Sequence, residues 1–184
     1  WPILIMFPIN HLLNYMATMY LMSGVQPPAV GNGHFVHVPY GTFRTQSRYL
    51  IVACMGDAFF IKLAQLLNDP FLLEERFRAQ PERYKYRHEI NACVQKHFEQ
   101  QTCEHWLEVL REARIPAAPV NDFAHALKDP QVLAREMVVE VPSATGRVIP
   151  QPGNPVKFSD TNEQRYTAAP TLGANTAAVL RELL

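Results

Sequence analysis

The sequence predicts an α+β fold, in which helices pack on a small antiparallel sheet and an extended helical arm follows at the C-terminus. Two runs rich in β-forming residues, 38–44 and 49–54, are separated by only four residues, a span typical of a hairpin. Segments with the helical spacing of apolar residues follow this hairpin. Near residues 116–119 prolines accumulate and the elements become short, which predicts the boundary between the compact part and the arm.

Capping residues and apolar faces define three of the predicted helices. Residues 9–22 carry apolar side chains on nearly every side, which is typical of a helix buried on several faces, and Gly24 can end that helix as its C-cap. Asp57 is placed to cap a helix that runs to about residue 68. Thr102 caps a further helix, whose inner face is predicted to include Trp106.

A long polar helix is predicted over residues 81–99, with Pro81 in its first turn. Its charged residues are expected to form a solvated face, which comprises Glu82, Arg83, Lys85, Arg87, His88 and Glu89. Beyond the boundary we expect an extended segment, two short helices, a second hairpin, a long loop and a terminal helix, in that order. These occupy residues 116–120, 122–127, 130–135, 137–141 with 146–149, 151–170 and 174–183.

The composition excludes several classes of function. The chain has 184 residues, of which 48% are hydrophobic, so it can bury a core. Its 17 Lys and Arg residues balance 17 Asp and Glu, and this neutral balance predicts binding neither to nucleic acid nor to an anionic membrane. The three cysteines, Cys54, Cys93 and Cys103, form no CxxC pair, which favours buried or helix-face thiols and a reducing, cytoplasmic location.

Four segments carry a resemblance to a known family. They are VGNGHFVHVPYGTF at residues 30–43, IPAAPVND at 115–122, DPQV at 129–132 and APTLGANT at 169–176. In this order and at these separations they resemble the C-terminal half of the family III CoA-transferases, also called the CaiB/BaiF family. That group holds formyl-CoA transferase, carnitine CoA-transferase and alpha-methylacyl-CoA racemase.

The resemblance implies that an N-terminal half accompanies this chain. In the family, that half supplies a Rossmann-like CoA-binding domain and the aspartate that carries the acyl group as a mixed anhydride. No catalytic residue can therefore be assigned within this chain. The resemblance divides the chain into a helical linker (1–30), a small α+β domain (31–118) and a C-terminal arm (119–184) that returns to the large domain or to a partner.

By the same resemblance, the intact enzyme takes an acyl-CoA and a carboxylic acid as substrates. Coenzyme A enters as a thioester substrate, so no bound cofactor is expected. Family members form interlocked dimers, which implies a homodimer, or a separate N-terminal half, as the partner. The apolar run at residues 1–7 fits such a partner, because it lacks the basic residues of a signal peptide and is broken by prolines well short of a membrane span.

The segment that follows residue 30 is the candidate substrate loop. In formyl-CoA transferase-like members the corresponding loop is rich in glycine and shields the acyl intermediate from water. Here bulky residues predict a stiffer loop, and they point away from formyl-CoA and oxalate specificity. The candidate residues are Gly31, Asn32, Gly33, His34, Phe35, Val36 and His37.

His34 has two interpretations. It can orient the carboxylate acceptor or hydrogen-bond an acyl oxygen, because its pKa lies near neutrality and either ring nitrogen can act. Alternatively, it fixes the loop by bonding a backbone carbonyl. In an extended segment His34 and His37 would face different ways. Tyr40 and Arg44 share a strand face, which is expected to be the exposed side of the hairpin rather than an anion site.

No metal site is predicted. His34 and His37 would share a face only on a helix, and His88, His97 and His105 lack cysteine or carboxylate companions at ligand spacing. A serine hydrolase is equally unsupported, because the sequence lacks a GxSxG turn.

Three hypotheses of function follow. The first is a C-terminal fragment or split subunit of an acyl-CoA:carboxylate CoA-transferase, inactive without the N-terminal half. The second is part of an acyl-CoA racemase of the same superfamily. The third is a stand-alone, non-catalytic remnant used for binding or oligomerisation.

Overall fold

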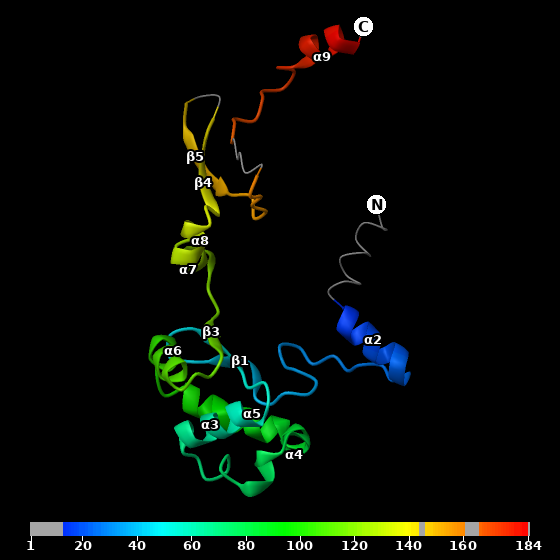
Figure 1. The fold of residues 1–184 in the computed structure, drawn as a ribbon. Helices are drawn as coiled ribbons and strands as arrows, with labels where there is room; N and C mark the ends of the chain where they lie inside the picture. The colour runs from blue at the N-terminus through cyan, green and yellow to red at the C-terminus, as the bar shows by residue number, and fades with distance from the viewer. Residues whose placement is uncertain (1–12, 144–145, 161–165, 184) are drawn as a thin grey trace. The chain divides into compact units, whose positions relative to one another are not determined.

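The computed structural model describes residues 13–143, 146–160 and 166–183, which divide into two units, Trp1–Val120 and Asn121–Leu184 (Figure 1). The sequence predicted the boundary between the compact part and the arm at residues 116–119, and the contacts between residues divide the chain into two units after Val120. The apolar run 1–7 and the start of the first predicted helix lie outside the described residues. Within the described ranges, no helix is both long enough and apolar enough to span a bilayer.

A three-stranded antiparallel sheet forms the centre of the first unit (Figure 1). Its order is β1 (Tyr40–Arg44), β2 (Tyr49–Ala53) and β3 (Ala117–Pro119), and the register pairs Phe43 with Leu50. The predicted hairpin is therefore confirmed, and the segment expected to be extended after residue 115 supplies the third strand. The first strand begins at residue 40 rather than 38, because the preceding proline has no N–H group for the ladder.

Helices cover the buried face of this sheet. They are α3 (Asp57–Leu67), a 3₁₀ turn η1 (Glu75–Arg78), α4 (Gln80–Lys85), α5 (Arg87–Phe98) and α6 (Cys103–Glu112). The core they enclose contains side chains with no solvent exposure, among them Leu50, Val52, Leu63, Phe77, Ile90, Val94, Phe98 and Leu110. Each such apolar side chain contributes about 1.5–3 kcal/mol by burial, so this unit has a substantial core of its own.

The single long helix predicted for residues 81–99 is wrong. Tyr86 leaves helical geometry, with φ −101° and ψ 24°, and separates α4 from α5. Its ring packs edge-on against buried Phe77, with ring centroids 5.6 Å apart, and the Arg76 guanidinium lies 4.4 Å from the centre of the Tyr86 ring. Sequence periodicity does not show such a break, because the tertiary contact that causes it comes from the preceding 3₁₀ turn.

Arg83 and Asp57 also differ from expectation. Arg83 was assigned to a solvated face, but its side chain is 1% exposed and its guanidinium lies over the ring of Phe60, at 4.7 Å. Arg83 Nη1 donates to the carbonyls of Phe77 and Arg78, and Nη2 pairs with Asp57 Oδ1 at 2.5 Å. Asp57 therefore does not cap α3, whose N-cap is Gly56; it neutralises a buried cation instead.

Helix α2 (Asn14–Ser23) precedes the sheet and ends as predicted. Gly24 adopts the left-handed conformation (φ 67°), and its N–H donates to the carbonyl of Tyr20 at 2.7 Å. Unlike the helices of the core, α2 has no buried residue, and Leu21 and Met22 are 81% and 84% exposed. The prediction of a helix buried on several faces is therefore wrong for the described residues of α2, whose apolar side chains are exposed or only partly buried.

The second unit consists of short elements. They are α7 (Phe123–Ala126), α8 (Pro130–Ala134), the antiparallel pair β4 (Val138–Pro142) and β5 (Val148–Pro152), and α9 (Thr176–Leu183). Asp122 and Asp129 cap α7 and α8 by accepting hydrogen bonds from backbone amides. The two short helices, the second hairpin and the terminal helix are confirmed, although β5 runs further than predicted, into the segment expected to be loop.

Candidate functional site

The candidate loop turns tightly around His34. His34 Nδ1 accepts hydrogen bonds from the backbone amides of Val36 at 3.0 Å and of His37 at 3.1 Å. Because Nδ1 is an acceptor, the neutral ring carries its proton on Nε2. The sequence suggested that His34 bonds the loop through a backbone carbonyl; the contact is instead with two amides, and it closes a turn within the loop.

Further side chains join this loop to the rest of the first unit. Gln80, the first residue of α4, donates to the carbonyl of Val36 and accepts from His37 Nδ1 at 3.3 Å. On the other side, Asn32 Nδ2 donates to Thr42 Oγ1 of β1 at 3.2 Å. The loop is therefore held at both ends by side-chain hydrogen bonds, and its stiffness stays a prediction.

The two histidines lie together, and the expectation that they face different ways is wrong. Their ring centroids are 4.5 Å apart, and the His34 ring also lies 4.4 Å from that of Phe35 and 5.1 Å from that of Tyr40. The expectation assumed an extended segment, whereas the bonds to His34 Nδ1 fold residues 34–37 into a turn. Tyr40 consequently faces the loop rather than the open surface.

A cavity of about 260 Å³ lies beside this turn. It is bounded by the loop on one side and by α4 and α5 on the other. The lining residues are Pro28, Ala29, Val30, Gly33, His34, His37, Val38, Tyr40, Tyr84, Arg87, His88 and Asn91. Of the seven candidate residues of the loop, Gly33, His34 and His37 thus line the cavity.

Helix α5 supplies polar groups to this cavity that sequence reasoning did not single out. Arg87 lies over the ring of Tyr84, with its guanidinium carbon 4.8 Å from the ring centre, and its Nη1 donates to the Tyr84 carbonyl at 3.0 Å. Asn91 Oδ1 is buried and has no hydrogen-bond partner among the described residues. Arg87 and His88 stood in the sequence within a run of charged residues, and nothing in that run distinguishes them from its solvated members.

The electrostatics of the site favour a neutral His34. Partial burial lowers the pKa of its imidazole below the ordinary value of 6.5, and the neighbouring charge of His37 lowers it further. Protonation at Nδ1 would also abolish the acceptor for both loop amides. The cavity therefore sets the Arg87 guanidinium near a neutral His34, an arrangement suited to a small carboxylate.

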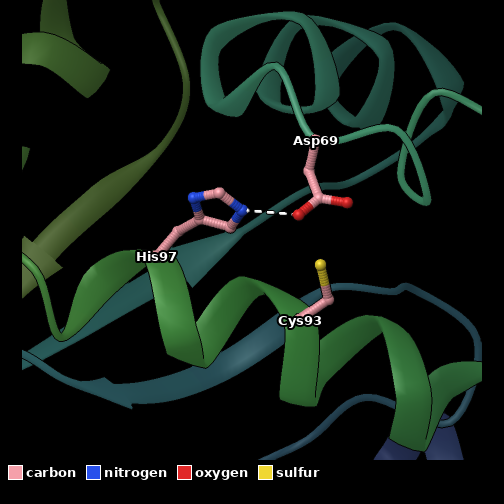
Figure 2. A group of neighbouring side chains, drawn as sticks. All are labelled: Asp69, Cys93 and His97. Atoms are coloured by element: carbon pink, nitrogen blue, oxygen red, sulfur yellow. Dashed lines mark hydrogen bonds and ion pairs between the residues drawn. The ribbon is translucent and has the colours of Figure 1, made fainter.

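The expectation that His97 has no cysteine or carboxylate companion is wrong. Asp69 and Cys93 lie beside it, with the three ligand-type atoms within 4.8 Å of one another (Figure 2). His88 instead lines the cavity, and His105 packs against Trp106 with ring centroids 5.5 Å apart. The three cysteines are free thiols; Cys54 and Cys103 are buried and Cys93 is half-buried on α5, which confirms the prediction of buried or helix-face thiols. Burial raises the pKa of Cys54 to about 12.

Comparisons with known proteins agree with the resemblance of the motifs. The family model of CoA-transferase family III matches residues 5–176. An acetyl-CoA:oxalate CoA-transferase from Acetobacter aceti is 31% identical over 87% of this chain and 40% of its own length. The human succinyl-CoA:glutarate CoA-transferase is 27% identical over 94% of this chain and 40% of its own length.

A solved structure shows the same fold. A CaiB/BaiF family protein from Brucella suis superposes with a TM-score of 0.77 and 31% identity, over 95% of this chain and 45% of that chain. This chain belongs to CoA-transferase family III. It corresponds to the C-terminal half of its relatives and spans about two fifths of the length of the curated relatives it matches.

Proposed function

We propose that this chain is the C-terminal part of an acyl-CoA:carboxylate CoA-transferase. The net reaction is RCO–SCoA + R′COO⁻ → RCOO⁻ + R′CO–SCoA, in which the thioester bond is exchanged and no electron or proton is consumed. The observation that carries the proposal is the cavity between the loop and α5, because it sets Arg87 and His88 of α5 beside the segment that resembles the family's substrate loop.

Transfer requires the N-terminal half, in this proposal. The family's aspartate attacks the thioester carbonyl, forms a mixed anhydride and releases the CoA thiolate, and that aspartate belongs to the other half. The residues of this chain act on the acyl side. His34 shapes the loop through Val36 and His37, and Arg87 binds a carboxylate in the cavity.

A dicarboxylic acid is the substrate class we propose. Two relatives are named for oxalate and for glutarate, and both compounds carry a second carboxylate that takes no part in the transfer. Arg87 can bind that second group bidentately, since only one of its donors is used by the Tyr84 carbonyl. We also propose a homodimer, and a reducing, cytoplasmic location that fits the three free thiols. The racemase and the non-catalytic remnant stay untested hypotheses.

Activity of the chain with and without its upstream segment tests this proposal. The purified chain, incubated with succinyl-CoA and a series of dicarboxylic acids, should form no new thioester, whereas the chain joined to the upstream sequence of its gene should do so. Turnover by the chain alone, above a buffer blank, would contradict the proposal and direct a search for a nucleophile to Asp57, Asp122 and Asp129.

Arg87→Gln in the joined protein tests the cavity. Losing a charge-assisted contact of about 1.5–3 kcal/mol should raise the KM for the dicarboxylate about 10–100-fold and leave the KM for a monocarboxylate acceptor nearly unchanged. Lys96→Gln is the matched control, since it removes one positive charge from an exposed position of the same helix, outside the cavity. Equal effects of the two variants would remove Arg87 from the site.

A further inference from the structure

A second cluster of chemically active side chains lies on α5, outside the cavity. Cys93 and His97 are four residues apart on this helix, so their side chains project from adjacent turns on one face. Asp69 comes from the segment that follows α3 and faces them (Figure 2). Of all the residues that the structure describes, only these form a group of three ligand-type side chains close enough to hold one ion.

We propose that Asp69, Cys93 and His97 form a binding site for a divalent zinc ion. The ligand atoms are one carboxylate oxygen, Sγ and Nε2, all within 4.8 Å of one another. Sulfur and imidazole ligands select zinc over magnesium and calcium, which prefer oxygen alone. Three protein ligands leave the fourth tetrahedral position to water.

The distance between the ligand atoms of Asp69 and His97 needs only a small adjustment. Asp69 Oδ2 and His97 Nε2 are 2.8 Å apart, and they share a hydrogen bond in the absence of an ion. In a tetrahedral zinc site with metal–ligand bonds of about 2.0–2.3 Å, ligand atoms stand roughly 3.3–3.6 Å apart. An ion that enters therefore has to replace this bond and separate the two atoms by about half an ångström, which side-chain rotation can supply.

The surroundings keep the three ligands in place and accessible. Asp69 Oδ1 accepts from the backbone amide of Phe71 at 2.9 Å, which fixes the carboxylate and leaves Oδ2 toward His97. The side chains of Asp69 and His97 are 24% and 22% exposed, so solvent reaches the site.

A zinc ion at this site would stabilise the position of α5, the helix that lines the cavity. Helix α5 carries Arg87, His88 and Asn91 into the cavity from its first half, and Cys93 and His97 stand in its second half. An ion held by these two residues and Asp69 would tie α5 to the segment after α3. The proposed site is thus structural, and it does not depend on CoA transfer.

Cobalt substitution and zinc titration of the purified chain test the proposal. With Co²⁺, the chain should show a thiolate-to-cobalt charge-transfer band in the near ultraviolet and the visible bands of a tetrahedral centre. Calorimetry with Zn²⁺ should give one ion per chain, and zinc at about a hundredfold excess over Kd should raise the melting temperature by roughly 10 °C.

Variants distinguish this site from binding elsewhere. Cys93→Ser, which keeps a hydrogen-bonding group beside Asp69, should abolish the charge-transfer band, and Cys93→Ser and His97→Gln should each weaken zinc binding at least about tenfold. His125→Ala is the control, because His125 forms an exposed pair with Asp122 at 2.6 Å and should not matter. Circular dichroism verifies that each variant is folded.

Two results would overturn the proposal. One is the absence of any cobalt spectrum or zinc heat with the folded chain at about 100 μM, well above the affinities expected of such sites. The other is zinc binding that survives both Cys93→Ser and His97→Gln, since the ion would then lie elsewhere.

Discussion

Replacing His34 by asparagine and by glutamine separates the roles of its two ring nitrogens. The Oδ1 atom of asparagine can occupy the position of Nδ1 and accept from the same two amides. The side-chain amide of glutamine reaches instead to the region of Nε2. If His34 acts as the structure indicates, through Nδ1, asparagine should preserve the turn and glutamine should not.

The magnitude follows from the two hydrogen bonds. Val36 and His37 both donate to His34 Nδ1, at 3.0 and 3.1 Å, and a net value of about 0.5–1.5 kcal/mol for each predicts a joint loss of roughly 1–3 kcal/mol. Hydrogen exchange at these two amides should therefore accelerate about 5–150-fold in His34→Gln, and about as much in His34→Ala. His34→Asn should exchange within about threefold of the original chain.

Exchange rates measured by NMR at the amides of Val36 and His37 provide the assay, with the amide of Val94 in the core as an internal reference. Protection that survives in His34→Gln but is lost in His34→Asn would refute the reasoning, because Nε2 would then be the working atom. Unchanged exchange in both variants would refute it as well, since the turn would not depend on His34.

The same contact predicts a dependence on pH. The folded-state pKa of His34 is lowered from 6.5, first by burial and then by His37, so the folded chain binds a proton less readily than the unfolded chain. The stability that neutral His34 contributes to the folded chain is fully present above about pH 6.5 and is lost as the pH falls from there through the folded pKa. His34→Asn does not titrate, so the unfolding free energy of the original chain, relative to that of His34→Asn, should fall from pH 7.5 to about pH 5.

Two further predictions concern the buried cation and the exposed helix. Asp57→Asn should destabilise the first unit by about 1–3 kcal/mol in urea unfolding, because the guanidinium of Arg83 is 1% exposed and would keep only neutral partners. The control, Glu75→Gln, breaks an ion pair exposed on both sides and should change the unfolding free energy by less than about 0.5 kcal/mol. Equal effects of the two variants would contradict the argument. The chain should also self-associate through the exposed apolar side chains of α2. The mass measured by light scattering at micromolar concentration should therefore exceed the 21.0 kDa of a monomer, and Met22→Glu should reduce it. A measured mass equal to that of the monomer would count against this prediction.

Local signals in the sequence were sufficient for most of the secondary structure. The hairpin follows from two β-forming runs around a four-residue turn, and Thr102 caps α6 as predicted, with its side chain accepting from the His105 amide. Gly24 ends α2 for a reason that is also local, since its left-handed conformation costs glycine little. Each of these features depends on neighbours within a few residues, which is the range over which sequence patterns are informative.

Only the loop of the candidate site could be predicted from the sequence, because sequence patterns are informative over a few residues. The motif around residue 30 located the loop, but the groups that face it come from α4 and α5, about fifty residues later, and they stand in a run of charges that resembles any exposed helix. Arg83 shows the limit most clearly. Its neighbours Glu82 and Lys85 form an exposed ion pair on the same helix, yet Arg83 itself points inward to Asp57, whose position depends on how α3 packs.

Asp69, Cys93 and His97 carry this argument one step further. The four-residue interval between Cys93 and His97 lies on a predicted helix and places two potential ligands on one face, so the expectation that His97 lacks a cysteine at ligand spacing overlooked it. What the sequence could not supply was the third group, because Asp69 lies 24 positions before Cys93 and reaches it only through the turn that ends α3. Two ligands on a helix are common and bind ions weakly, whereas a third from another segment couples ion binding to the fold, so the tertiary contact decides whether such an interval is a site.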